Sequence, residues 1–247
     1  MIMPASRKIV LPLLLSLLSA CASIPIETQP AAIYKEGEGL YESKRYDDAI
    51  AQYKKVRDAY ASTELSSSAE LRIADAYFES ERYIEASAEY AQFRKLHPTH
   101  PKAPYALYRI GLCNFNQITG IDRDQTPQKN AAIYFEEFLS KYPKSEYTKD
   151  VTEKLEAVRS QQLQYEQYVA GFYYRTEKYD AAIKRLEVAL ATFPKSPLHD
   201  ETFFLLGACR LKSGEQDKAR EAFNRLSTDF PDSKYIIQAG KLLEKYY

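Results

Sequence analysis

The sequence predicts an all-α solenoid of five stacked helical hairpins that ends in a capping helix. The main observation is a trio of small residues and prolines that recurs with 12 residues between its members and, in the regular units, 13 residues to the next trio. A period of 37 residues is typical of helical-hairpin repeats, which mostly bind other proteins. The trios are Gly37, Ala49 and Ala61; Ala74, Ala86 and Pro98; Gly111, Ala131 and Pro143; Ala170, Ala182 and Pro194; and Gly207, Ala219 and Pro231.

The composition agrees with one elongated domain. Of the 247 residues 45% are hydrophobic, which is enough for a core that a solenoid buries repeat by repeat. The chain carries 34 basic and 34 acidic residues. This balance gives no indication of nucleic acid or another polyanion as a partner.

The first twenty residues are typical of a bacterial lipoprotein signal peptide. Arg7 and Lys8 precede an apolar run, 9–18, that is too short to span a bilayer as a helix. The run ends in Leu-Ser-Ala-Cys, where a small residue before Cys21 permits cleavage. We therefore expect residues 1–20 to be removed. The alternative is an ordinary secretory signal followed by a coincidental cysteine.

The three cysteines are expected to differ in role. Cys21 would carry several acyl chains, and burial of about 0.8 kcal/mol per methylene makes these a lasting anchor. Ala22, in place of Asp, points to the outer membrane, with residues 21–30 as a tether and the protein facing the periplasm. Cys113 and Cys209 fall in first helices of non-adjacent repeats. We expect them to be buried free thiols.

The helices follow from apolar spacing and from recurrent stop signals. In the first repeat, Ile33, Gly37 and Leu40 share one helical face, and the second helix repeats this spacing. Three second helices end in related turns: Tyr-Pro-Lys-Ser at 142–145, Phe-Pro-Lys-Ser at 193–196 and Phe-Pro-Asp-Ser at 230–233. The proline stops one helix and the serine can cap the next.

The small residue of each first helix, the alanine of each second helix and the closing proline resemble the tetratricopeptide repeat. This resemblance implies a right-handed superhelix. An ordinary helical bundle, the alternative, would not keep the register in four of five units. We predict one solenoid over 31–247, with repeats at about 31–63, 64–100, 101–144, 145–196 and 197–232 and a capping helix at 233–247.

Two insertions interrupt the period. Eight extra residues fall within a polar loop at 119–127, and loops of this kind are often functional. Fourteen more lie before Ala170, in a stretch without Gly or Pro. Because fourteen residues are close to four helical turns, we expect one long helix from Glu146 to Arg175 with its buried face unrotated. The charged Glu244 stands where the next small residue would fall, as expected for a solvent-facing capping helix.

No group of residues indicates catalysis, a metal site or a cofactor. His97 and His100 are separated by prolines that forbid a regular helix, so we interpret them as part of a turn. Asp122 and Asp124 begin like a calcium loop, but the glycine and glutamate that such a loop requires are missing. We therefore expect a non-catalytic binding protein.

The first helices supply a candidate substrate groove. Counting from the small residues gives two trios with i, i+4, i+7 spacing, so that each trio shares a helical face. Aromatic side chains there would suit an extended peptide with aromatic side chains. The alternative is that these residues pack on neighbouring helices. The residues are Tyr34, Glu38 and Tyr41 in the first repeat and Leu71, Asp75 and Phe78 in the second.

Three stretches resemble the YfiO-type (BamD) lipoproteins of the outer-membrane β-barrel assembly machine: 97–101, 120–128 and 142–148. The resemblance implies a periplasm-facing scaffold bound to the outer membrane through its lipid. Its C-terminal repeats would hold the POTRA domains of the barrel-forming partner BamA, and its N-terminal repeats would receive unfolded outer-membrane proteins. Arg185 matches the family arginine that pairs with a POTRA carboxylate. The extra C-terminal helix departs from the enterobacterial pattern.

Two other functions remain open from the sequence. Periplasmic repeat proteins of the Tol-Pal and cell-division system have similar repeats, but they usually carry an N-terminal coiled coil and no lipid box. Pilus-secretin assembly lipoproteins keep a near-regular 34-residue period. An enzyme has no supporting residues.

Overall fold

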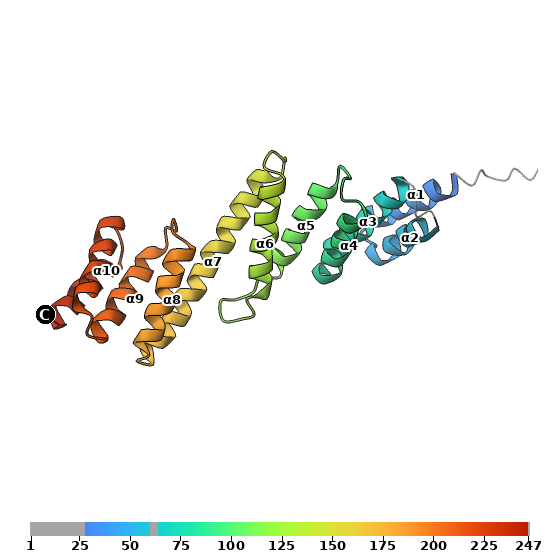
Figure 1. The fold of residues 1–247 in the computed structure, drawn as a ribbon. Coiled ribbons are helices and arrows are strands. Elements are labelled where there is room, and N and C mark those ends of the chain that lie inside the picture. The colour runs from blue at the N-terminus through green and yellow to red at the C-terminus, as the bar shows by residue number, and fades with distance from the viewer. Residues whose placement is uncertain (1–27, 60–63, 247) are drawn as a thin grey trace, which may run out of the picture.

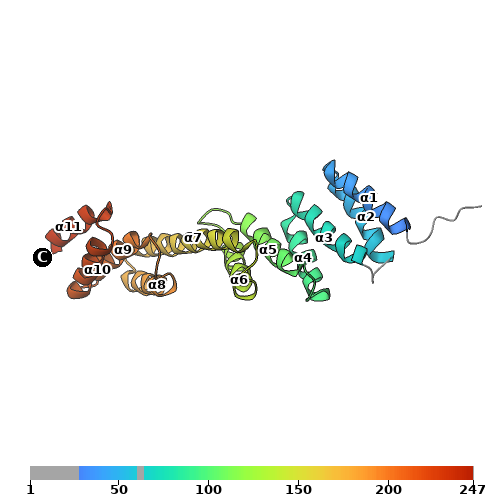
Figure 2. The same cartoon turned by 90° about the horizontal axis from the view of Figure 1, so that it is seen from above.

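A computed structural model describes residues 28–59 and 64–246 of the chain, and this part consists of eleven α-helices joined by short turns, with no strand. The helices pack in sequence as antiparallel pairs along an elongated stack (Figures 1 and 2). The predicted all-α solenoid of five hairpins and a capping helix is confirmed. The pairs are α1 (Thr28–Glu42) with α2 (Tyr46–Ala59), α3 (Glu64–Glu79) with α4 (Tyr83–Leu96), α5 (Ala103–Asn116) with α6 (Thr126–Lys141), α7 (Thr148–Arg175) with α8 (Tyr179–Thr192), and α9 (His199–Lys212) with α10 (Gln216–Asp229).

The recurring small residues allow the two helices of each hairpin to approach closely. A Cβ atom added at Gly37 would lie 2.7 Å from the Tyr53 ring, and one at Gly207 would lie 2.5 Å from the Phe223 ring. Gly111 lies equally close to Phe135. Each aromatic ring thus occupies the space that a side chain would need, which explains why the period is marked by Gly and Ala.

The turn inside the hairpin is built the same way in four of the five pairs. One residue there has a left-handed φ, namely 58° at Lys44, 60° at Glu81, 59° at Glu177 and 80° at Gly214. In the first pair the Arg45 N–H then donates to the Leu40 carbonyl at 2.9 Å. This is the Schellman pattern that ends helices. In the third pair the eight-residue insertion replaces this turn.

Helix α7 is shared by two parts of the stack. It runs for 28 residues and starts two residues later than the sequence predicts. Its first half buries Val151, Leu155 and Val158 in one cluster with side chains of α5 and α6. Its second half buries Ala170 in a different cluster with α8 and α9. The two halves of the solenoid are therefore joined by a single continuous helix (Figure 1).

The stack ends in α11 (Tyr235–Tyr246), which packs on α9 and α10. Ala239 is its one buried residue, and Glu244 is exposed as a capping helix requires. The predicted burial of Cys113 and Cys209 as free thiols is also confirmed. No helix in the described part of the chain is long and apolar enough to cross a membrane.

Candidate functional site

A ladder of aromatic rings and cations follows the first helices of the N-terminal repeats. In each of three repeats an aromatic residue stands four positions after the small residue, and a cation from the next first helix lies over its ring. The charged-group-to-centroid distances are 4.9 Å for Arg72 over Tyr41, 3.7 Å for Arg109 over Phe78 and 5.0 Å for Lys154 over Phe115. We call these three pairs the ladder.

The ladder arises from the regular period. Residues separated by one repeat occupy equivalent places on neighbouring first helices, so one ring–cation pair is reproduced along the stack. Planar guanidinium groups stack well on aromatic faces, and each such pair contributes about 0.5–1 kcal/mol when exposed and more when desolvated. The ladder therefore fixes neighbouring repeats to one another and presents stacked flat groups.

Carboxylates lie beside the ladder in the first two repeats. Glu38 accepts a hydrogen bond from the Tyr53 hydroxyl at 2.5 Å and forms an ion pair with Arg72. Tyr53 can reach Glu38 because its ring passes over Gly37. The second repeat uses Asp75 in the same position.

Asp75 joins three helices. It is only 8% exposed and accepts hydrogen bonds from the hydroxyls of Tyr90 on α4 and Tyr105 on α5, the latter at 2.6 Å. Guanidinium nitrogens of Arg72 and Arg109 lie 3.9 and 4.0 Å from its oxygens. These donors and cations compensate the negative charge of the buried carboxylate. Its partners therefore depend on one another.

The pKa shifts agree with this network. Burial, followed by the charges of Asp75 and Glu79, raises the pKa of Tyr41 to about 12. Burial and the Asp75 charge likewise raise the pKa of Tyr105. Burial opposes ionisation of Arg109, but the neighbouring tyrosines and Asp75 outweigh it and raise the pKa of that guanidinium. The tyrosine hydroxyls thus remain donors and the arginines remain charged at neutral pH.

The structure brings most of the predicted groove residues into this network. Tyr34, Glu38, Tyr41 and Phe78 are half-buried, and the Tyr34 ring lies 5.4 Å from that of Tyr53. Leu71 is 8% exposed and belongs to the core cluster of the first repeats. Asp75 is buried as well. Binding of a substrate by these residues stays a prediction.

Sequence reasoning missed Arg72 and Arg109, which connect the predicted residues. Both stand two positions before the small residue of their repeats. Recurrence of arginine at one register, next to a recurring aromatic residue, was a signal that could have found them. Tyr90 and Tyr105 had no comparable signal, because a buried tyrosine cannot be distinguished from other core aromatics by spacing.

Arg185 lies on α8, in the C-terminal half. Its guanidinium pairs with Glu166 of α7 at 2.6 Å and lies 6.0 Å from the centroid of the Tyr165 ring. The side chain is about one-third exposed. Arg185 is therefore half-buried and held by a carboxylate of its own hairpin, and its contact with a partner stays a prediction. Cys21, the predicted lipidation site, lies outside the described residues.

The remaining sequence motifs lie in turns. His97 bonds Glu70 at 2.8 Å, and His100 Nδ1 accepts from the Lys102 backbone N–H at 3.0 Å. Asp124 accepts from the Thr126 backbone N–H at 2.9 Å, which orders the end of the inserted loop. These contacts support the interpretation of both motifs as turns.

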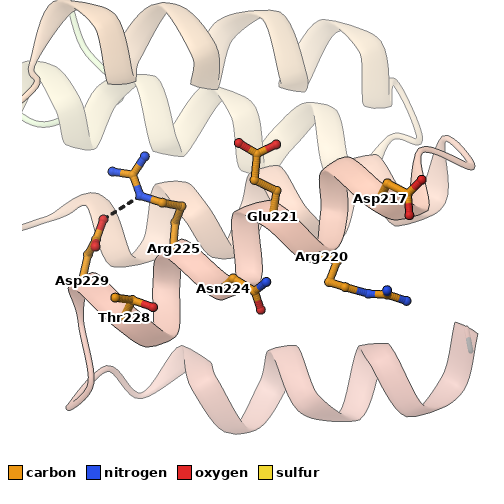
Figure 3. Close-up of a pocket in the computed structure, with 7 residues that line it drawn as sticks. All are labelled: Asp217, Arg220, Glu221, Asn224, Arg225, Thr228 and Asp229. Carbon is orange, nitrogen blue, oxygen red and sulfur yellow. Dashed lines mark hydrogen bonds and ion pairs between the residues drawn. The ribbon is translucent and has the colours of Figure 1, made fainter.

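A shallow depression also lies on the outer side of α10 (Figure 3). Its side chains alternate in charge along one helix, and Arg225 pairs with Asp229 at 2.7 Å. The residues lining it are Asp217, Arg220, Glu221, Asn224, Arg225, Thr228 and Asp229. This is the pattern of a solvated helix face with one i, i+4 ion pair rather than of a binding site.

Comparison with known proteins identifies the family. The family model of YfiO, described as "Outer membrane lipoprotein", matches residues 26–222. The chain belongs to the YfiO family. The matched region covers the ladder and Arg185 and ends inside α10, so α11 lies beyond it.

Two relatives cover 94% and 74% of the chain. An outer membrane protein assembly factor BamD from Neisseria meningitidis is 27% identical over 94% of this chain and 95% of its own length. The protein of the same name from Vibrio cholerae is 30% identical over 74% of this chain and 81% of its own length. Among solved structures, the TPR2AB domain of yeast Sti1 in complex with pHSP90 covers 89% of this chain and 86% of its own at 14% identity, with a TM-score of 0.48.

Proposed function

We propose that this YfiO-family chain is a non-catalytic, lipid-anchored scaffold in the assembly of outer-membrane proteins. The observation that carries the proposal is the match to assembly factors named BamD over almost their full length. The fold agrees with a scaffold, since a solenoid offers extended binding surfaces.

The C-terminal half would hold a BamA-type barrel protein through its POTRA domains. Arg185 supports this role because its guanidinium is partly exposed on the edge of the α7–α8 hairpin. Glu166 orients the arginine and occupies one side of its planar fork. A partner carboxylate could bind the remaining N–H groups, since a guanidinium offers five donors.

The N-terminal half would receive unfolded outer-membrane proteins along the ladder. Half-buried rings at Tyr41 and Phe78 offer apolar area, and the stacked guanidinium groups offer further flat surface. An extended segment with aromatic side chains would bury those side chains against the ladder. Ionic contacts would be weak, because Arg72 and Arg109 are already paired.

The lipid on Cys21 would keep this half near the membrane. Helix α1 begins at Thr28, seven residues after Cys21. Seven residues span at most about 25 Å when fully extended. The first repeats would therefore lie close to the periplasmic surface of the outer membrane, and the C-terminal half farther along the stack.

Affinity purification of the membrane-anchored protein tests the proposal. We expect the wild-type chain to recover a BamA-type protein, and an Arg185→Glu variant to recover at least ten-fold less because like charges would then meet. Lys184→Glu is the matched control, since it makes the same charge change at the adjacent exposed residue. Recovery of no barrel-assembly partner by the wild-type chain would contradict the proposed function.

A Cys21→Ser variant tests the anchor. We expect the variant to move from the membrane fraction to the soluble periplasmic fraction, because it would lack the acyl chains that hold it at the membrane. Fractionation and immunoblotting measure the change. If the variant stays in the membrane fraction after a high-salt wash, lipid attachment at Cys21 is wrong.

A further inference from the structure

In the second, third and fifth repeats, one face of the first helix packs against the second helix of the preceding repeat. This face is formed by three residues, which stand five positions before, one position before and two positions after the small residue of the repeat. In α5 these are Ala106, Ile110 and Cys113, each at most 1% exposed and in one cluster with side chains of α4. The equivalent residues are equally covered in α3 (Ala69, Ile73 and Ala76) and in α9 (Thr202, Leu206 and Cys209).

The fourth repeat breaks this rule. The same three positions of α7 are Tyr165, Val169 and Phe172, and none of them is buried. Phe172 is 49% exposed, and the neighbouring Tyr168 is 48% exposed. The first and third of these positions hold small, covered residues in the second, third and fifth repeats and aromatic residues here. The face is half-buried at Tyr165 and Val169 and exposed at Phe172.

The extension of α7 explains why the face is open. The preceding second helix, α6, packs on the first half of α7 and ends near its middle, while α8 packs on the second half (Figures 1 and 2). Fourteen residues at 1.5 Å each displace the fourth repeat by about 21 Å from the position that α6 would cover. An uncovered length of helix face follows directly.

The open face continues the stripe that α5 and α6 already bury. Val151, Leu155 and Val158 form the covered part of that stripe, with steps of four and three residues. The same alternation leads on to the four residues that we call the open seam: Gln162, Tyr165, Val169 and Phe172. Alternating steps of four and three form the seam along which helices pack side by side.

We propose that the open seam binds an amphipathic helix of a partner protein, which lies along α7 beyond the N-terminal end of α6. Continuity with the α6–α7 interface identifies the occupant as a helix, because the same stripe on the same helix is covered by a helix over its first half. The large side chains of the seam require small or apolar residues, at heptad spacing, on the bound helix.

The first repeat shows that an uncovered face alone does not produce such residues. Its equivalent positions are Ala32, Glu36 and Gly39, all exposed. At that end of the described stack the face is small or charged. Aromatic residues at the equivalent place in the fourth repeat are therefore not a general consequence of exposure, and exposed aromatic clusters mark protein interfaces.

Charged groups frame the seam without neutralising it. On α8, Arg185 is held by Glu166, and Lys184 is exposed beside it. Arg175 is exposed at the end of α7. A bound helix would thus find an apolar centre with charged rims, which is the usual composition of a specific interface. The inference does not depend on which assembly the partner belongs to.

Site-specific photo-crosslinking of the full-length, membrane-anchored chain in cells tests the inference. Benzoylphenylalanine would replace Val169 or Phe172 in turn, and mass spectrometry would identify the linked peptide. Ile84 on α4 is the matched control position, because it is 73% exposed and lies on another outer face. We expect an adduct at both seam positions, at least ten-fold above the Ile84 yield, with a helical segment whose apolar residues have heptad spacing.

A second variant keeps the result independent of folding. Phe172→Lys should reduce the Val169 adduct at least ten-fold, whereas Ile84→Lys should not change it, and both proteins should melt at the wild-type temperature because both side chains are exposed. The inference is overturned by adducts to an extended segment, by adducts to a second copy of this chain, or by no adduct above the control. An adduct formed by a chain that recovers no barrel-assembly partner would refute only the proposed function.

Discussion

The Asp75→Ala substitution is the most direct test of the network beneath the ladder. Asp75 is the acceptor for two tyrosine hydroxyls and lies within 4.0 Å of two guanidinium groups. Removing it leaves Tyr90 and Tyr105 without their acceptor. It also removes one of the carboxylates that offset Arg109, which keeps its contact with Glu79 at 3.1 Å.

The size of the effect follows from burial. Tyr90 is fully buried, so its unsatisfied hydroxyl costs about 1–3 kcal/mol. Tyr105 is half-buried and can partly turn to water, so about 1 kcal/mol is reasonable. Arg109 retains Glu79 and adds about 1 kcal/mol or less, because only one of its two partners is lost. We expect the free energy of unfolding to fall by about 2–5 kcal/mol, the sum of these contributions.

Urea denaturation of the purified chain, followed by circular dichroism at the helical band, measures this loss. Asp47→Ala is the control, since the Asp47 side chain is 87% exposed although it also pairs with an arginine. That variant should change the free energy of unfolding by less than about 0.5 kcal/mol. Equal effects of the two substitutions would show that Asp75 is not the centre of an interdependent network.

Two further predictions concern packing and pH. Gly111→Ala should lower the free energy of unfolding by about 1–3 kcal/mol, because the new methyl group would overlap the Phe135 ring. Gly39→Ala is the control: its methyl group would enter open space and should raise the free energy of unfolding by up to about 1 kcal/mol. Thermal melts in which the two variants shift alike would contradict this account. Burial lowers the pKa of His199, so the unfolded state binds the proton more readily, and stability should decline as the pH falls through the ordinary histidine value of about 6.5. That decline should be weaker in a His199→Gln variant, and equal slopes of unfolding free energy against pH in the two proteins would refute it.

Much of the fold could be predicted because its signals are local. Small residues at fixed spacing mark close helix contacts, and Gly37 or Gly207 is required by the ring that packs on it. The length of α7 followed from a stretch without Gly or Pro. The predicted start of α7 is two residues early, because Glu146 still lies in the turn before the helix. The Thr148 hydroxyl donates to the Tyr142 carbonyl across this turn, and α7 begins at Thr148.

The candidate site could be predicted only in part, because it depends on contacts between repeats. Spacing placed Glu38 and Asp75 on one side of the first helices. It did not show that tyrosines of other helices donate to both, nor that Arg72 and Arg109 stack on rings of the preceding repeat. Such contacts join residues 15–34 positions apart in the sequence. They become visible only in the structure, because the superhelix determines which helices lie next to one another.

The length of the α7 insertion determines both how the C-terminal half is oriented relative to the half that carries the ladder and where the open seam lies on α7. At 100° per residue, fourteen residues turn the helix by about four full turns less 40°, so the hairpin that follows faces nearly the same way as the one before. An insertion of twelve or sixteen residues would turn it by more than 100° and carry Arg185 to a different side of the stack. Fourteen residues are also two heptads, so the stripe of Val151, Leu155 and Val158 continues in phase to Phe172. A single insertion thus separates the two halves of the solenoid, preserves their relative direction, and exposes a length of helix that is already patterned for packing against another helix.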